Sequence, residues 1–582
     1  MSGHDLASLA VIAALCVPLV LTVAVMIPAL RGVGMALAPW AALPALGLGL
    51  GTGVSVHWKP VLLGMRLYAP DEVTRTYLLF TGILWLFSGL FARGYLREDS
   101  HRASFWGFFL ATLAGNVGAV LAQDVASFYL FFAMMTFCAY GLVVHERTEA
   151  AARAGRVYII MALLGEVLLL AAFFLTVGTR INLSLAEVPR VVAESSSREV
   201  ICVLILGGFG VKVGALLLHM WLPLAHPVAP APGSAVLSGT IIKVGVLGWL
   251  RFLPLGHASL PTLGTVCVAA GLTAAFYGVA VGLTQREAKT VLAYSSISQM
   301  GFLTLAVGLA LGAPEAAPVL IGAVLVYAVH HSLAKGLLFL GTGLLPATGR
   351  KGWRGVLVLV GLTWSALEIA GAPLTSGALA KLALKSAEAA AHASEALPTL
   401  LSLAAVGSTL IMARFLERTV PKAPEQGSPG AGGMLLAWVL LLVVDTALLL
   451  WPPVGREELP HLLESKSLVS AAWPVVAGVL LTGLVWRSRR WRSWRVPEIP
   501  PGDVLWPVAR VLLPGWRRLT AGADREPPEQ EHVGEGPPSR FARFRRASLD
   551  DFENAEEGLS QLSHVGLALL LFLGVFLLLL VR

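Results

Sequence analysis

Long apolar stretches recur from one end of this sequence to the other, and they constrain the fold more than any other feature. A helix that spans a bilayer needs about 20 mainly apolar residues. About sixteen such stretches follow one another, the first centred near residue 17 and the last near residue 572. Only 13% of the residues are charged, whereas soluble proteins carry about 25%. The sequence therefore predicts an all-α protein that crosses a membrane many times.

Basic residues gather in alternate loops of the predicted topology. Their placement explains the net charge of +8, so the charge does not indicate a protein that binds nucleic acid. The basic loops fall at 93–102, 147–156, 286–289, 350–354, 414–422 and 487–492. The positive-inside rule makes their side of the membrane cytoplasmic. We expect a multi-pass protein of the bacterial cytoplasmic (inner) membrane with both termini in the periplasm.

Two of the spans are interrupted by glycine and proline. The seventh runs from Gly207 to Pro223 and into a proline-rich loop, and the twelfth contains the stretch from Gly371 to Gly377. A broken helix is tolerated in lipid where it lines a polar cavity, and two breaks at corresponding positions mark a transport path. Because five spans separate the breaks, we expect two inverted five-helix units. The segments are 1–103 (three helices), 104–254 and 261–416 (the units), 430–490 (two helices), 491–562 (amphipathic and polar surface) and 563–582 (a final span).

Lysine is rare in this sequence, with ten residues against thirty-three arginines. An ionisable side chain at membrane depth is costly unless it faces a cavity or a partner. Lysine loses its proton when it is desolvated, whereas arginine stays charged, so buried lysines indicate a proton path. Near helix ends, Lys289 and Lys385 are equally compatible with snorkelling to the surface. The lysines inside apolar runs are Lys212, Lys243, Lys335 and Lys381.

Two adjacent histidines, His330 and His331, precede Lys335 in the eleventh span. Histidine titrates near neutral pH, which suits a relay between lysines, and His331 and Lys335 share one helical face. The alternative is that these histidines only pack. His219 and His226, near the first break, are equally compatible with hydrogen bonds at a loop end.

Few acids lie within the apolar runs. Glu166 is the best candidate for a charge partner of Lys212, because a nearby carboxylate holds a lysine charged. Glu368 is thirteen residues from Lys381, about 20 Å along a continuous helix, so no pairing is expected there. Asp445 is interpreted as a structural hydrogen-bond partner.

The four cysteines are far apart, and the sequence has no CxxC motif or Cys/His cluster. We therefore expect no metal site, no cofactor and no redox centre in this chain.

The motifs around these residues resemble those of the antiporter-like membrane subunits shared by respiratory complex I, Mrp antiporters and group 4 membrane-bound hydrogenases. They are most similar to the formate hydrogenlyase and hydrogenase-4 branch. The matching stretches are GFGVK ending at Lys212, AHP at residues 225–227, SGTIIKVG around Lys243, HSLAK from His331 to Lys335, and GAPLTSGALAK ending at Lys381.

This resemblance implies fourteen core helices, two inverted repeats with broken helices, and a hydrophilic axis through the membrane. It implies that Lys212 is the pumping lysine, that Lys243 and His331 are relay positions, and that Lys381 is the exit lysine. The C-terminal segment resembles a lateral helix, although Pro507 and Pro514 interrupt it.

Two positions depart from the family pattern. Ala133 stands where the family usually has a glutamate in the fifth span, and Tyr327 stands where a histidine is common. Either Glu166 replaces the missing acid, or pumping is altered or lost.

Three functions remain open at this stage. The preferred one is a proton-translocating subunit of a complex I-like or hydrogenase-like energy-converting complex, which implies other membrane subunits as partners. The second is a subunit of a cation/proton antiporter, or another ion-coupled transporter, without a redox partner. The third is a non-pumping scaffold subunit. The scarcity of membrane carboxylates favours protons over sodium, which prefers oxygen ligands.

Overall fold

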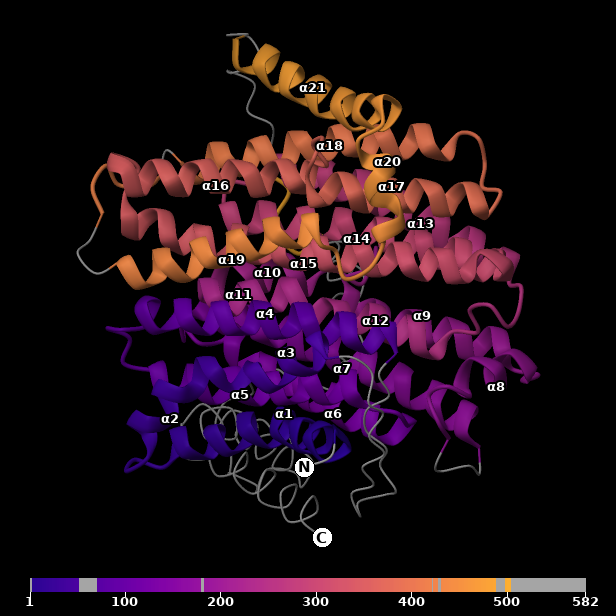
Figure 1. Cartoon of the computed structure of the whole chain (residues 1–582), viewed down its shortest axis with the longest axis horizontal. Helices are drawn as coiled ribbons and strands as arrows, with labels where there is room; N and C mark the ends of the chain where they lie inside the picture. The colour runs from indigo at the N-terminus through magenta and orange to yellow at the C-terminus, as the bar shows by residue number, and fades with distance from the viewer. Residues whose placement is uncertain are drawn as a thin grey trace, which may run out of the picture. The chain divides into compact units, whose positions relative to one another are not determined.

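The structure is a computed structural model that describes residues 3–51, 71–178, 183–420, 422–427, 431–487 and 498–503. These residues form helices joined by short loops, with a single β-bridge between Asp124 and Ser184 and no strand (Figure 1). The chain divides into two units, Met1–Lys59 with Leu63–Gly502, and Pro60–Leu62 with Asp503–Arg582. All the helices below belong to the first unit.

The N-terminal helices precede the predicted five-helix units, and α3 packs against α4. They are α1 (Gly3–Met26), α2 (Arg31–Leu37), the 3-10 turn η1 (Ala38–Ala42), α3 (Leu43–Leu50) and α4 (Glu72–Tyr95).

The next helices fall into two runs with the same order of elements: two helices, one longer helix, one broken helix and a fifth helix. The first run is α5 (Arg102–Leu121), α6 (Val125–Val143), α7 (Glu149–Val177), then, after the short α8 (Val188–Glu194), α9 (Arg198–Val213) with α10 (Trp221–Val228), and α11 (Ala231–Val236) with α12 (Ile242–Phe252). The second run is α13 (Pro261–Thr284), α14 (Ala288–Gly312), α15 (Ala317–Thr348), α16 (Gly352–Ala370) with α17 (Ser376–Ala390), and α18 (Leu397–Thr419). The two five-helix units and their inversion stay a prediction.

Three further helices follow the second run. They are α19 (Gly432–Leu450), the short α20 (Leu459–Leu462) and α21 (Ser465–Arg487). The predicted surface segment, apart from residues 498–503, and the predicted final span near residue 572 lie outside the described residues.

Fourteen helices among the described residues are long and apolar enough to cross a membrane. The all-α membrane class is therefore confirmed, while the count of about sixteen is not. The difference has two sources: α9 and α10 are each too short to be counted, and the last predicted span is not described.

Glycine in the left-handed region ends a helix at both predicted breaks. Gly214 has φ +73° directly after α9, and Gly371 has φ +81° directly after α16. Most side chains avoid this conformation, so glycine favours it. The side chain of Thr375 then caps α17 by accepting a hydrogen bond from the N–H of Ala378 at 3.3 Å. Both breaks therefore follow from local sequence chemistry.

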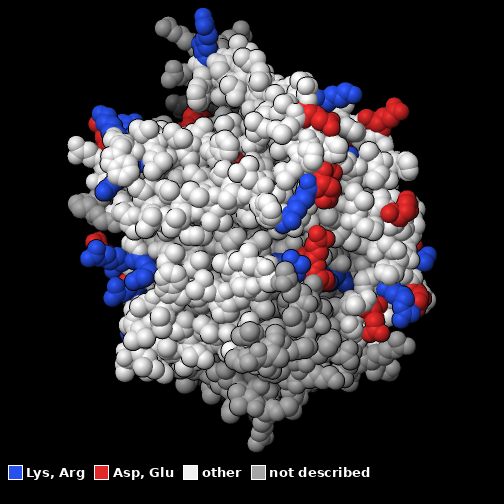
Figure 2. All heavy atoms as spheres, in the orientation of Figure 1, with Lys and Arg blue, Asp and Glu red and all other residues white. Residues whose placement is uncertain are grey.

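Charged side chains gather at the two ends of the helices, and the face in view between them is mainly uncharged (Figure 2). The ends on the left of the view carry mainly lysine and arginine; α16 begins there, after Arg350 and Lys351, which bind Glu425. At the opposite end, Arg251 binds Asp71 and so joins α12 to the start of α4. Although burial works against ionisation, the bonds from Arg251 and Thr74 hold the pKa of Asp71 below its usual value.

Candidate functional site

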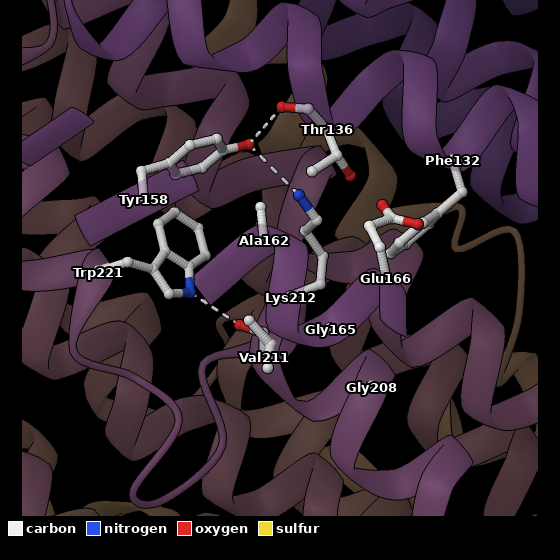
Figure 3. Close-up of a pocket in the computed structure, with 10 residues that line it drawn as sticks. All are labelled: Phe132, Thr136, Tyr158, Ala162, Gly165, Glu166, Gly208, Val211, Lys212 and Trp221. Atoms are coloured by element: carbon white, nitrogen blue, oxygen red, sulfur yellow. Dashed lines mark hydrogen bonds between the residues drawn. The ribbon is translucent and has the colours of Figure 1, made fainter. Parts of the chain in front are cut away.

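Side chains from several helices enclose a small cavity around Lys212 (Figure 3). α6 contributes Phe132 and Thr136, α7 contributes Tyr158 and Glu166, and α9 contributes Lys212 itself. Space of about 10 Å³ is open to the centre of a water molecule, which is room for about one water. The buried lysine therefore has space for a hydrogen-bonded water beside it.

The ammonium group of Lys212 is held by aromatic side chains. It donates a hydrogen bond to the hydroxyl of Tyr158 at 3.3 Å, and it lies 5.4 Å and 5.6 Å from the ring centroids of Tyr158 and Phe132. Tyr158 in turn donates to the carbonyl oxygen of Thr136 at 2.8 Å. The position of the lysine head is thus determined by α6 and α7.

Glu166 reaches the same cavity from α7, and it is only 4% exposed. Its carboxylate is close enough to Lys212 for electrostatic attraction, with the side chains of Tyr129 and Thr136 nearby. Neither carboxylate oxygen has a hydrogen-bond partner of normal geometry in the described part of the chain. The structure therefore places the predicted acid beside the predicted lysine without a direct ion pair.

Ala133, which stands in place of the family's glutamate, lies on α6 directly after the cavity-lining Phe132. Thr136 lies about one turn further along and also lines the cavity. A carboxylate at position 133 would therefore project from the helix next to the Lys212 site. Glu166 approaches the lysine from a different helix.

A lysine and a histidine meet between α12 and α15. Lys243 Nζ lies 2.5 Å from His331 Nδ1 and donates to the carbonyl oxygen of Ser238 at 2.5 Å. Ser238 belongs to a π-helical turn, Leu237–Ile241, and such turns are frequent at functional sites. On α15, Lys335 donates to the carbonyl oxygen of Leu292 at 2.9 Å. Lys243, His331 and Lys335 are all fully buried.

No carboxylate neutralises the two central lysines within the described ranges, where neither Lys243 nor Lys335 forms an ion pair. The two ammonium groups are close enough to repel each other when both are charged. Like charges at short range disfavour double protonation. A proton on one lysine therefore disfavours a proton on the other.

Another buried histidine lies between this centre and the basic loops. His226 is fully buried, its ring stacks on Phe339 at 4.4 Å between centroids, and neither ring nitrogen has a partner in the described part of the chain. Ala229 lies three residues after His226, and its carbonyl oxygen accepts a hydrogen bond from Lys289 Nζ at 2.6 Å. Lys289 therefore binds inside the protein and does not simply snorkel.

Lys381 lies on the second broken helix, where α17 begins beside the end of α16. Its ammonium group donates to the carbonyl oxygens of Ala370 at 2.5 Å and Ile369 at 3.4 Å. Because the helix is broken, the distance of about 20 Å expected from a continuous helix does not apply. Glu368 nevertheless forms no ion pair with Lys381 among the described residues.

A larger cavity extends from Lys381 between α17, α18 and α21. Its volume is about 230 Å³, enough for several water molecules. Lys385 lines it and donates to the hydroxyls of Ser402 at 3.2 Å and Ser470 at 2.8 Å. Lys466, in the first turn of α21, lines it as well. The cavity therefore joins the second break to the helix ends opposite the basic loops.

Sequence reasoning missed several polar groups at these sites. Tyr158 was detectable, because Tyr158, Ala162 and Glu166 follow at i, i+4 and i+8 and so share one face of α7. The role of Ser238 depends on a π-helical turn, which no pattern in the sequence indicates.

No group of three or more His, Cys, Asp or Glu side chains suitable for a metal occurs within the described ranges. The predicted absence of a cofactor therefore stays a prediction.

Together, the fold and these sites define a multi-pass helical membrane protein with two broken helices and a series of buried bases. Residues 122–394 match the model of the NADH:quinone oxidoreductase/Mrp antiporter transmembrane family. Residues 122–394 are therefore similar to the transmembrane domain of this family, and the chain is homologous to subunits of complex I, hydrogenase-4 and Mrp antiporters, as its motifs indicated.

Two curated relatives and one solved structure illustrate the similarity. Hydrogenase-4 component B of Escherichia coli (strain K12) is 30% identical over 284 residues, 47% of this chain and 42% of the relative. A Na(+)/H(+) antiporter subunit of Alkalihalophilus pseudofirmus is 29% identical over 317 residues, 52% of this chain and 62% of the relative. A chain of the Mrp complex from Dietzia sp. DQ12-45-1b superposes with a TM-score of 0.64 and 21% identity, covering 82% of this chain and 99% of that one, and so shows the same fold. The chain spans about half the length of the first curated relatives it matches.

Proposed function

We propose that this protein translocates protons as a membrane subunit of a redox-driven, energy-converting complex. The observation that carries the proposal is the direct contact between Lys243 and His331, with Lys335 buried nearby and no carboxylate paired to either lysine in the described part of the chain. Buried bases that repel one another suit a path in which each proton displaces the next.

The proposed path begins at the basic helix ends and passes Lys289 and His226 to the central lysines. Its proposed exit is Lys381 and the cavity lined by Lys385. Lys212 and Glu166 would control loading in the first half. In this proposal the basic ends face the cytoplasm of a bacterium and both termini face the periplasm.

The partners in this proposal are other membrane subunits, because hydrogenase-4 component B and the Mrp chain are, by name, components of complexes. In this proposal, other subunits carry out the electron transfer. The experiments below distinguish this function from the two alternatives, a cation/proton antiporter and a scaffold.

The test is a Lys243→Met substitution in the complete complex, reconstituted in vesicles with a pH-sensitive dye. Proton uptake is expected to fall by roughly tenfold or more, because the central relay loses its titratable group. Lys351→Met, on an exposed loop, is the control and should leave uptake unchanged. Undiminished uptake by an assembled Lys243→Met complex would contradict the proposal, and sodium-dependent uptake without electron transfer would favour the antiporter.

A further inference from the structure

Two buried carboxyl groups meet between α16 and α19, close to the second break. Glu368 is 1% exposed and Asp445 is 2% exposed. Because α16 packs against α19, their carboxyl groups are close enough to interact with each other. Glu368 Oε2 and Asp445 Oδ2 have no hydrogen-bond partner of normal geometry in the described part of the chain. Two carboxylates at this distance in an apolar interior do not both stay ionised, because their charges repel.

A chain of hydrogen bonds connects this pair to α15. The hydroxyl of Ser376 donates to Glu368 Oε1 at 3.4 Å, and the same hydroxyl lies 2.8 Å from His330 Nδ1. His330 is 3% exposed and precedes His331, which contacts Lys243. The hydrogen-bonded path from the pair therefore ends at His330, the residue next to the histidine that contacts the central lysine.

No cation binds the pair directly within the described ranges. Lys381, the nearest lysine in sequence, donates to backbone carbonyls. Lys243, Lys335 and Lys381 act electrostatically on His330, and Trp364 lies beside Glu368. A negative charge on the pair therefore has no ion-pair partner in the described part of the chain, and only a further proton, on the pair or on His330, can compensate it.

A base precedes the first helix break, and an acid precedes the second break at a similar position. Lys212 lies two residues before the left-handed Gly214 and faces Glu166 on α7, the longer helix of the first run. Glu368 lies three residues before the left-handed Gly371 and is linked to His330 on α15, the longer helix of the second run. The acid and the base have exchanged places between the two runs. This favours a functional role for the pair over a purely structural one.

We propose that Glu368 and Asp445 form a proton-binding pair that exchanges one proton with His330 through the hydroxyl of Ser376. His330 releases the proton on Nδ1 to Ser376 Oγ while the hydroxyl proton of Ser376 passes to Glu368 Oε1. The pair changes from one shared proton and one negative charge to two protons and none, and the imidazolium becomes a neutral imidazole. The total charge is zero before and after, so the exchange leaves no unpaired charge in the apolar interior. The inference rests on the proposed proton translocation.

The test uses infrared spectroscopy of the purified complex, which detects the carbonyl band of a protonated carboxylic acid and its shift in D₂O. The wild type should show such a band, Glu368→Gln and Asp445→Asn should each shift it, because each leaves one buried carboxyl without its neighbour, and the double variant should remove it. Glu388→Gln, which changes another buried glutamate on α17, is the matched control and should leave this band in place. Ser376→Ala should keep the band but slow its deuterium exchange by roughly tenfold or more, and Ser376→Thr should restore the rate.

The inference is overturned if the wild type lacks this band, if either single variant leaves it unshifted, if the double variant retains it, or if Ser376→Ala exchanges at the normal rate. A band that appears only after sodium is removed would make the pair a cation site and would also overturn it. The proposed function is tested separately, by proton uptake. A complex that moves no protons but shows the expected band and exchange contradicts only the function. If the complex translocates protons but its carbonyl band is the same in Glu368→Gln and Asp445→Asn, only the proposed proton-binding pair is contradicted.

Discussion

At the scale of single residues, Lys212 shows how a buried ammonium can be held without being fixed as a cation. Its ammonium group contacts the Tyr158 hydroxyl and the ring faces of Tyr158 and Phe132. A cation–π contact contributes about 0.5–2 kcal/mol, whereas breaking a buried ion pair costs about 3–5 kcal/mol. The weaker contacts allow the lysine to release its proton, and Glu166 is placed to hold the charged form by attraction.

Glu166→Gln tests this arrangement at the residue scale. The substitution keeps the shape of the side chain and removes the charge that attracts the Lys212 ammonium. We expect proton uptake to fall by about tenfold or more, equivalent to about 1.4 kcal/mol in the barrier, while the complex still assembles. Glu149→Gln, at the exposed start of the same helix, should have no effect. Normal uptake by the Glu166 variant would rule out the pairing with Lys212.

At the scale of elements, the broken helices do what a continuous helix could not. The break between α16 and α17 places the start of α17 beside the end of α16, so that Lys381 donates to the carbonyls there. A cation at this position is favoured by the negative end of the helix dipole. The break thus positions the proposed exit lysine at the wall of the larger cavity.

Gly371→Ala tests the role of this break. The residue has φ +81°, and an added Cβ would lie 2.7 Å from Lys381 Nζ. We expect a loss of stability of about 1–2 kcal/mol from the left-handed conformation, with reduced proton uptake because the lysine is displaced. Gly178→Ala is the matched control: its φ is +53°, and an added Cβ would meet nothing within 4 Å.

Thermal unfolding and proton uptake separate the two effects. The control should lose stability but keep its uptake. Equal uptake by the two glycine variants would show that the position of Lys381 does not matter.

At the scale of the whole molecule, the buried bases extend through the first unit. They run from Lys289 at the basic helix ends, through the contact of Lys243 with His331, to the cavity lined by Lys381 and Lys466. Transport requires this whole series, whereas a scaffold requires only the packed helices. The two functions therefore predict different results when both ends of the series are changed.

A Lys212→Met and Lys381→Met double variant distinguishes these functions. If the chain translocates protons, uptake should be lost while electron transfer and assembly of the complex persist. Lys351→Met with Lys422→Met, which changes two exposed loop lysines bound to Glu425 and Glu287, is the control. Unchanged activity and unchanged coupling in the test variant would establish the scaffold.

Much of this protein could be predicted from the sequence because the relevant signals are local. A stretch of about 20 apolar residues determines a span by itself, and Gly214 and Gly371 determine where helices break. The cost of an ionisable group in lipid singled out Lys212, Lys243, Lys335 and Lys381, whatever their neighbours are. The class of protein was accessible from these features and from the motifs around them.

Contacts between helices were decided only by the tertiary structure. Lys243 and His331 are 88 positions apart, and their contact depends on the π-helical turn Leu237–Ile241 and on the packing of this turn against α15. Glu368 and Asp445, interpreted from sequence as an unpaired acid and a structural partner, meet only because α16 and α19 lie together. Helical periodicity specifies which face a side chain occupies but not which helix packs against that face. The sequence alone therefore identified which groups can carry protons, and the packing of the helices decided which of them are close enough to exchange one.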